Sequence, residues 1–224
     1  MRFQYLLTLL GLGLIAFGLV ERGWELLLVW LGIDFLLLGI AHARNAHRIF
    51  GKRPDGTMSF SKRLIFLPLL GYTSVVWHLA RVLSREPASQ NITSDLVIGR
   101  RLLASEIDGE FDNYVDLTAE FSEPLTIRRS PSYRSFPVLD GAAPDPESLR
   151  EAIASLRPGR TFIHCAQGHG RTGLFTLAVL LKSGAAGSVD DGLRMLQAIR
   201  PGIRLSRAQQ ECIRLYADAL ARNR

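Results

Sequence analysis

Two long apolar stretches occupy the beginning of the chain, and shorter apolar runs alternate with polar residues after them. The first, residues 3–20, carries no charge over 18 positions, close to the minimum for a helix that crosses a roughly 30 Å hydrocarbon layer. The second, residues 26–43, follows after a short polar turn. Because the turn offers no small-residue cleavage site, the pattern predicts a retained transmembrane hairpin and not a cleaved signal peptide.

Polar residues modify this picture at two places. Asp34 lies near the middle of the second stretch, where an ionised carboxylate costs roughly 3 kcal/mol or more unless it is paired or protonated. We expect Asp34 to be neutral or hydrogen-bonded between helices; a proton or ion site is the alternative. A third apolar stretch, residues 64–80, contains Pro68 and Gly71, which weaken a straight spanning helix, and we expect it to lie in the membrane interface.

Basic residues set the expected orientation of these segments. Six of them lie between residues 42 and 63, where the one acidic residue is Asp55. The tendency of basic loops to stay inside places this segment and the N-terminus in the cytoplasm. Arg81 and Arg85 follow the third stretch. We therefore expect an integral protein of the inner or cell membrane whose remaining residues are also cytoplasmic.

The pattern changes after residues 84–90, which we expect to link a membrane region, 1–83, to a soluble domain, 91–224. Short runs with β-branched or aromatic members predict strands at residues 96–99, 114–117, 134–138 and 161–164. Helices are predicted to begin at Pro146, Thr172, Val189 and Ser206, the first of them capped by Asp145. Strands followed by helices predict an α/β fold with a central sheet flanked by helices.

Composition and charge exclude several classes of protein. The chain has 224 residues, of which 47% are hydrophobic and two are cysteines, so it is neither a disulfide scaffold nor a disordered protein. Lys and Arg number 27 against 21 Asp and Glu. Five of the six excess positive charges lie in residues 1–90, which hold 10 basic and 5 acidic residues. The excess therefore belongs to the membrane region, and we expect no nucleic-acid partner.

A glycine-containing loop between a predicted buried strand and an apolar helix carries the candidate chemistry. Glycine permits positive φ, so successive backbone N–H groups can point at one anion, and the helix adds its N-terminal dipole. The planar guanidinium of Arg171 can hold two phosphate oxygens, and the same positive surroundings favour the thiolate of Cys165. Cys165 is therefore the predicted nucleophile, whereas Cys212 is expected to be an inert buried thiol. The predicted phosphate-binding residues are Ala166, Gln167, Gly168, His169, Gly170 and Arg171.

The run His164-Cys165, five residues, then Arg171-Thr172-Gly173 resembles the signature of the cysteine-dependent protein phosphatases, both tyrosine-specific and dual-specificity. The likeness extends over about residues 91–221 and implies a dual-specificity-phosphatase-like sheet. It also implies transfer of phosphate to the cysteine and then to water, with an aspartic acid protonating the leaving oxygen.

The resemblance assigns roles to several neighbours of the nucleophile. Asp140 follows a predicted strand 25 residues before Cys165 and is the expected general acid; Asp145 is the runner-up, better explained as a helix cap. Thr172 is expected to hydrogen-bond the leaving sulfur, and His164 to support the loop from behind. His169 either faces the substrate or is a bystander.

One position departs from the family pattern. Leu205 stands where classical tyrosine phosphatases have a water-positioning glutamine, which favours the dual-specificity branch and leaves Gln167 as a speculative substitute.

No cofactor is expected. The five histidines include no His-Glu-x-x-His spacing, the chain has no cysteine pair, and no Walker-type lysine follows the glycines. Sulfur transfer and arsenate reduction use a similar cysteine, loop and arginine, but they account less well for Asp140.

The predicted function is hydrolysis of a phosphomonoester through a phosphocysteine, with a phosphoprotein as the expected substrate because the loop contains no lysine. A lipid phosphate, such as phosphatidylglycerophosphate or a phosphoinositide, is the alternative, because membrane helices bring it within reach. A catalytically silent phosphate-binding adaptor is less favoured. A separate transport or sensing role for the membrane region is a further alternative.

This assignment predicts the pH dependence of the reaction. Because Asp140 must be protonated while Cys165 is ionised, kcat/KM should follow a bell-shaped profile with its maximum on the acidic side of neutrality. Steady-state hydrolysis of an aryl phosphate across the pH range tests this. A profile that stays flat from pH 5 to 8 would contradict the pairing of these two residues.

Overall fold

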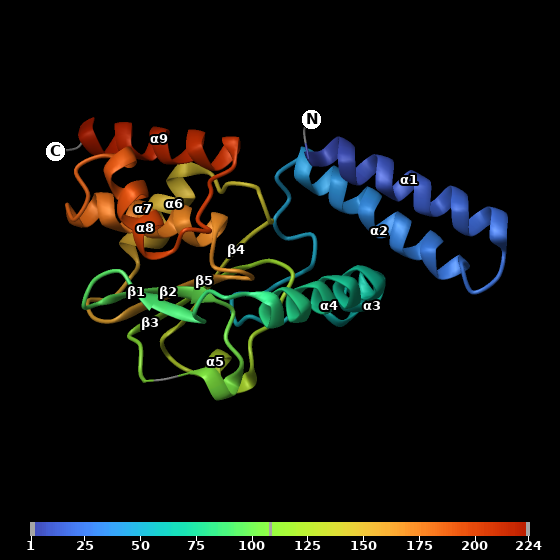
Figure 1. Cartoon of the computed structure of the whole chain (residues 1–224), viewed down its shortest axis with the longest axis horizontal. Coiled ribbons are helices and arrows are strands. Elements are labelled where there is room, and N and C mark those ends of the chain that lie inside the picture. The colour runs from blue at the N-terminus through green and yellow to red at the C-terminus, as the bar shows by residue number, and fades with distance from the viewer. Residues whose placement is uncertain (1–2, 108, 223–224) are drawn as a thin grey trace.

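The computed structural model describes residues 3–107 and 109–222, and a five-stranded sheet lies at its centre (Figure 1). The strand order is β1-β2-β5-β3-β4, in which only β1 is antiparallel to its neighbour. The strands are β1 (Ser89–Asn91), β2 (Leu96–Arg100), β3 (Asn113–Thr118), β4 (Tyr133–Val138) and β5 (Thr161–Cys165). The α/β prediction is confirmed, and the four parallel strands end at one edge of the sheet.

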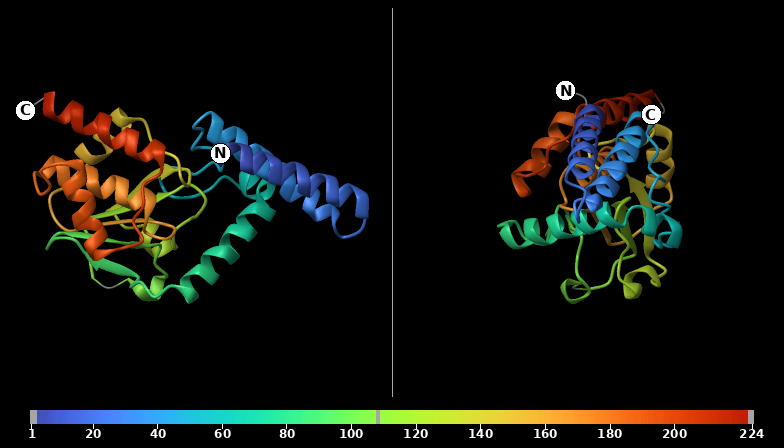
Figure 2. Two further views of the ribbon diagram at one scale, coloured as in Figure 1. Left: turned by 45° about the horizontal axis from the view of Figure 1, so that its top comes forward. Right: turned by 90° about the vertical axis from the view of Figure 1, so that its right-hand side faces the viewer.

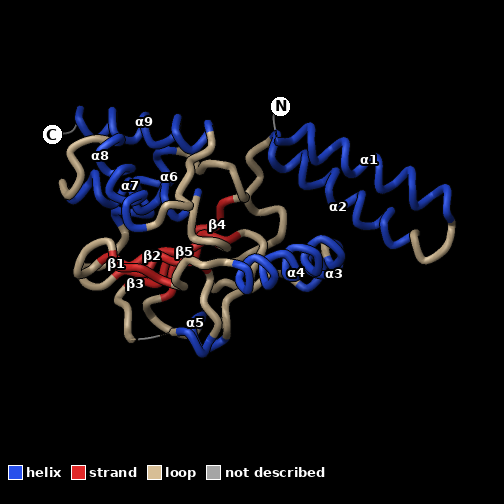
Figure 3. Tube along the Cα trace, in the orientation of Figure 1, coloured by secondary structure: helices blue, strands red, loops and turns tan. Residues whose placement is uncertain are grey.

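Helices cover one face of this sheet, as Figures 1 and 3 show. Ile98, Val115 and Ile163 point into a core shared with these helices, whereas Tyr114 and Phe162 face the opposite side, near α5 (Leu125–Arg128). The covering helices are α6 (Pro146–Ala154), α7 (Gly170–Ser183), α8 (Val189–Ile199) and α9 (Arg207–Arg222). Two predicted helix starts, at 146 and 189, are confirmed; the other two helices begin two residues earlier and one residue later than predicted.

Helices α1 (Phe3–Glu21) and α2 (Leu26–Ala43) form the expected hairpin, which projects away from the sheet (Figure 1). Each is long and apolar enough to cross a membrane, and only 17% and 28% of the two apolar windows are buried inside the protein. Gly11 and Gly32 allow the close approach, because a Cβ at either would lie 2.7 Å from the other's carbonyl oxygen. The hairpin therefore leaves most of its apolar surface for another environment.

Helix α4 (Leu67–Leu83) starts against the middle of α2 and runs from the hairpin to the sheet (Figure 2). It follows α3 (Phe60–Ile65), so the apolar stretch 64–80 is divided between two helices. Pro68 lies in the first turn of α4, where a proline is tolerated. The Asp34 carboxylate accepts a hydrogen bond from the Leu69 amide at 3.2 Å, in the first turn of α4. This is the interhelical bond expected for Asp34: it satisfies an amide that the helix itself leaves free.

Candidate active site

Cys165 ends β5, and the loop after it closes around the sulfur before α7 begins. The Gly168 amide donates to the Cys165 Sγ atom at 3.3 Å. Gly168 adopts a φ of +76°, and a Cβ there would collide with the Gly99 carbonyl, so a side chain is excluded on both grounds. No side chain caps the first turn of α7, so its backbone donors are available to an anion.

Arg200 braces this loop from outside, and the sequence analysis did not identify it. Its side chain is buried and donates to the carbonyl oxygens of Gln167 and Gly168 at 3.0 and 2.9 Å. A trans peptide points its N–H opposite to its C=O. The Gln167 carbonyl held by Arg200 therefore turns the Gly168 amide away from Arg200 and toward Cys165, where it donates to the sulfur.

Arg171 lies in the first turn of α7 with its guanidinium buried beside the loop. Its two terminal nitrogens donate to Glu120 at 2.9 and 2.8 Å. Burial alone would lower the pKa of Arg171, but the carboxylates of Glu120 and Asp140 raise it well above its ordinary value. The cation is therefore permanent.

Two buried polar atoms of this turn have no hydrogen-bond partner among the described residues: the Arg171 Nε and the Thr172 hydroxyl. Buried donors without partners are rare in folded proteins, and at a phosphate or thiolate site an anion completes them. Arg171 was predicted to bind phosphate and Thr172 to hydrogen-bond the sulfur, and these are the two residues that keep an unsatisfied donor.

Two carboxylates meet Arg171, of which only one was predicted. Asp140 follows β4, and its Oδ1 lies 3.2 Å from the Arg171 Nη2, with 78% of its side chain exposed at the mouth of the site. Glu120 follows β3 and was missed, although carboxyl ends of parallel strands are where such groups gather. Asp145 accepts from two amides at the start of α6 and is the cap that the sequence predicted.

His169 is turned toward the segment after α4. Its Nε2 lies 2.6 Å from a carboxylate oxygen of Glu86, which also accepts from the Gly202 amide at 3.1 Å. Burial would raise the pKa of Glu86, but the bond to His169 and the charge of Arg200 lower it below its ordinary value. The Glu86 carboxylate therefore ties the connection after α4 to the loop.

Trp77 of α4 makes a second direct contact with the loop. Its indole N–H donates to the Ala166 carbonyl at 3.0 Å, and the ring is almost fully buried. The same carbonyl accepts from the Arg101 amide at 3.2 Å, so two donors outside the loop hold it. No pattern within the apolar stretch 64–80 distinguished this tryptophan from its neighbours.

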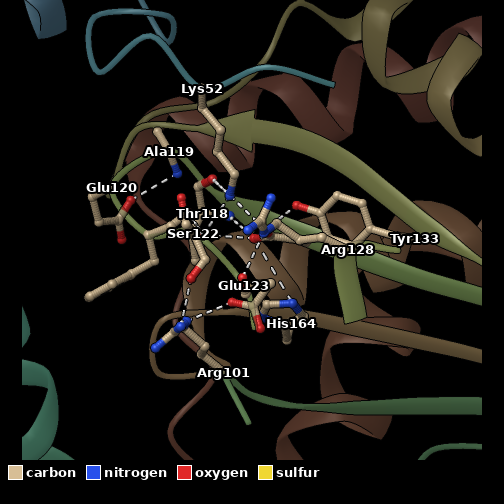
Figure 4. Close-up of polar contacts among 12 residues, drawn as sticks. Lys52, Arg101, Thr118, Ala119, Glu120, Ser122, Glu123, Arg128, Tyr133 and His164 are labelled. Atoms are coloured by element: carbon tan, nitrogen blue, oxygen red, sulfur yellow. Dashed lines mark hydrogen bonds and ion pairs between the residues drawn. The ribbon is translucent and has the colours of Figure 1, made fainter. Parts of the chain in front are cut away.

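A buried polar cluster surrounds His164, and Lys52, Thr118 and Tyr133 belong to it (Figure 4). The Lys52 ammonium reaches it from the segment after α2 and lies 2.6 Å from the Asp116 carboxylate and 2.6 Å from the Thr118 carbonyl. The Tyr133 hydroxyl donates to the same carboxylate at 2.7 Å. Neither charged side chain of the pair is exposed at all. The pair is therefore a fully desolvated link between the segment after α2 and the sheet.

Burial and neighbouring charges shift the pKa values of Asp116, His164 and Glu123 in different directions. Burial would raise the pKa of Asp116, but Lys52 and His164 hold it well below its ordinary value. Burial lowers the pKa of His164 to about 4 despite the nearby Asp116 carboxylate. Burial and repulsion from Asp116 raise the pKa of Glu123 to about 7, although Arg101 opposes this. At neutral pH, His164 is thus a neutral ring whose Nδ1 lies 3.3 Å from the Cys165 carbonyl oxygen.

The ligand atoms of Asp116, Glu123 and His164 lie within 4.8 Å of one another, close enough to hold a metal ion. The three residues do not follow any metal-ligand spacing in the sequence, so the sequence did not predict this grouping. The Lys52 ammonium already contacts Asp116, so these residues fit a buried ion pair better than a cation site.

No family model matches the chain, and no curated protein matches it in sequence. Solved structures do match. Tk-PTP in its active form has a TM-score of 0.53 and 25% identity over 59% of this chain and 97% of its own. PTPMT1 in complex with PI(5)P has a TM-score of 0.52 and 11% identity over 61% and 99%. Human DUSP28 has 0.51 and 17% over 62% and 100%.

These neighbours are protein tyrosine and dual-specificity phosphatases, which confirms the family resemblance and the fold class.

The buried ion pair predicts a large effect of Lys52→Met. Removing the ammonium leaves a buried carboxylate without its partner, so the free energy of unfolding should fall by roughly 3–5 kcal/mol at neutral pH. The double variant Lys52→Met/Asp116→Asn should recover much of this loss, because position 116 then carries no charge that needs the ammonium. Thermal unfolding in detergent, followed by circular dichroism, measures both, with Arg53→Met at the exposed neighbouring position as control.

The deficit of Lys52→Met should also depend on pH. In the wild type the depressed pKa of Asp116 gives stability that is complete above the ordinary aspartate pKa and is lost below it. Without Lys52, burial raises this pKa and the carboxyl binds a proton in the folded state. The deficit should therefore shrink between pH 7 and pH 5; a deficit independent of pH would contradict this account.

Proposed function

Because the chain has the fold of the cysteine-dependent phosphatases, we propose that it hydrolyses phosphomonoesters through a phosphocysteine intermediate. The observation that carries the proposal is an amide that donates to the Cys165 sulfur beside a permanent cation, Arg171, whose charge is felt at that cysteine. The Gly168 amide contacts Cys165 Sγ, and Arg171 keeps a buried Nε without a partner among the described residues. This arrangement suits a bound phosphate in front of the nucleophile.

In the first step the Cys165 thiolate attacks phosphorus. A sulfur–phosphorus bond forms and the bond from phosphorus to the leaving oxygen breaks. Asp140, at the exposed mouth of the site, gives its proton to that oxygen. The loop amides and Arg171 stabilise the charge on the three remaining phosphate oxygens.

In the second step water attacks the phosphocysteine. Its proton passes to the Asp140 carboxylate, the sulfur–phosphorus bond breaks, and inorganic phosphate leaves. The Thr172 hydroxyl, which has no partner among the described residues, donates to the departing sulfur. The cycle ends with the thiolate and a protonated Asp140.

Glu120 acts as a positioning residue in this scheme. By accepting from both terminal nitrogens of Arg171 it fixes the plane of the guanidinium and leaves the Nε edge for phosphate. Its carboxylate also balances the buried cation when no substrate is bound.

Residues 1–83 anchor the phosphatase part to a membrane, with the site on the cytoplasmic side. The support is the pair of apolar helices, the basic segment that follows them and the need for a reduced thiol. Phosphoprotein and phospholipid are both accessible to a site held there.

A silent phosphate-binding adaptor would share the fold and the anion cup but would not turn over. The presence of Cys165, Arg171 and Asp140 around one site favours catalysis.

The mechanism predicts separate effects of two substitutions. Cys165→Ser should abolish hydrolysis of para-nitrophenyl phosphate, because the serine hydroxyl is not ionised. Asp140→Asn should lower kcat by roughly 10²–10⁴ for an alkyl phosphate, whose leaving oxygen needs a proton, and by much less for a nitrophenyl ester. Steady-state kinetics with both leaving groups measures the difference.

Asp145→Asn is the matched control, since Asp145 caps α6 and contacts no reacting group in the proposed scheme. Equal losses for both leaving groups in Asp140→Asn would remove Asp140 as the general acid. Full turnover in Cys165→Ser would remove the phosphocysteine.

A further inference from the structure

A cavity of about 410 Å³ lies between the membrane helices and the candidate active site. Its floor is the phosphate site itself, because Ala166, Gln167 and Arg171 line it together with Asp140. Its walls are apolar and come from three helices: Leu7 and Leu10 of α1, Phe35 and Leu38 of α2, and Tyr72 and Val76 of α4. The cavity, called here the hairpin groove, therefore has one polar end and one hydrocarbon-like end.

We infer that the hairpin groove holds the hydrocarbon part of the substrate, which is a membrane lipid with a single phosphomonoester on a small headgroup. The inference rests on the proposed function and specifies its substrate. The phosphate sits in the Cys165 loop, and the acyl or prenyl chain lies along α1, α2 and α4.

The apolar wall favours a lipid over a phosphopeptide. A peptide that filled the groove would bring backbone N–H and C=O groups against leucine and valine side chains, and each polar group buried without a partner carries a penalty. A hydrocarbon chain has no such groups and gains by leaving water. The apolar wall of the hairpin groove therefore suits the hydrocarbon tail of a lipid, which has no hydrogen-bonding atoms.

The position of the wall gives a lipid a route to the site. The wall residues of α1 and α2 belong to the two helices that are long and apolar enough to cross a membrane. Val75, Leu79 and Val82 of α4 are each more than half exposed, so an apolar surface continues outward from the groove. A lipid can therefore enter sideways without passing through water.

The charges at the polar end limit the headgroup. Arg171 is the single Arg or Lys among the described lining residues, and it is accompanied by the carboxylates of Glu120 and Asp140. A second phosphate near these carboxylates would meet like charge without a compensating cation. A headgroup with one phosphomonoester is accommodated, whereas a polyphosphorylated inositol is disfavoured.

The first experiment compares substrates on the full-length wild-type protein in phosphatidylcholine vesicles. The probes are dioleoyl phosphatidate, glycerol 3-phosphate, a phosphotyrosine peptide and para-nitrophenyl phosphate. Phosphatidate and glycerol 3-phosphate share a headgroup and differ in the acyl chains. We expect kcat/KM for phosphatidate to exceed that for glycerol 3-phosphate and for the peptide by at least about 100-fold, within the range that pocket contacts confer.

The second experiment uses matched pairs of neighbours that differ in whether they line the groove. Val76 and Leu10 line it, whereas Val75 and Leu9 are exposed beside them and do not. Val76→Asn and Leu10→Asn should lower kcat/KM for phosphatidate by roughly 10-fold or more relative to para-nitrophenyl phosphate. Val75→Asn and Leu9→Asn should leave that ratio near the wild-type value, and the aryl phosphate reports whether each variant is folded.

The outcomes separate this inference from the proposed function. If the wild type hydrolyses none of the four probes, the phosphatase assignment itself fails. If the aryl phosphate is turned over but the peptide equals or exceeds phosphatidate, the lipid inference fails while the phosphatase assignment stands. Equal effects within each matched pair would show that general membrane contact, and not the groove, governs the rate, which also overturns the inference.

A bisphosphorylated phosphoinositide supplies the last comparison. Its hydrolysis at a rate equal to that of phosphatidate would overturn the restriction to a single phosphomonoester; a rate at least about 10-fold lower is expected.

Discussion

The ion pair between Lys52 and Asp116 is the constraint on which the rest of the arrangement depends. Lys52 lies between the hairpin and α3, whereas Asp116 lies on β3 in the sheet. Because neither side chain is exposed, both charges are stable only while they remain in contact. The pair therefore holds the base of the hairpin against the carboxyl edge of the sheet. That edge is also where β5 ends at Cys165, so one contact brings the base of the hairpin and Cys165 to the same side of the sheet.

The loop around Cys165 is shaped by contacts that come from outside it. Arg200 holds two of its carbonyls, Trp77 holds a third, and Glu86 pairs with the His169 ring. The Gln167 carbonyl drawn outward turns the Gly168 amide toward Cys165, so the shape of the loop depends on groups that do not contact the sulfur. Two of these groups belong to α4 or the segment after it, which connects the geometry of the loop to the helices that precede the sheet.

Local patterns in the sequence were sufficient to predict most strands and helices of the α/β part and the loop from Cys165 to Arg171. The strands ending at Val138 and Cys165 follow from short β-branched and aromatic runs, and Asp145 was readable as a cap because its partners are two and three residues away. Strand β1 was missed because its three residues are polar and show no alternation. Glu120, Lys52 and Arg200 were missed because their partners lie 51, 64 and 32 residues away, and no spacing rule links groups that only the sheet brings together.

The indole of Trp77 and the ammonium of Lys52 both come from residues 1–83 and both form buried contacts with the sheet or the loop after Cys165. A fragment starting at the linker would keep Cys165, Arg171 and Asp140, yet Asp116 would lose the ammonium that pairs with it. The Ala166 carbonyl would keep the Arg101 amide as a donor but would lose the Trp77 indole. Removing residues 1–83 would consequently disturb the sheet and the loop after Cys165, in addition to any change in where the protein resides. The segments that precede the sheet thus contribute two buried side chains, Lys52 and Trp77, to the interior of the α/β part.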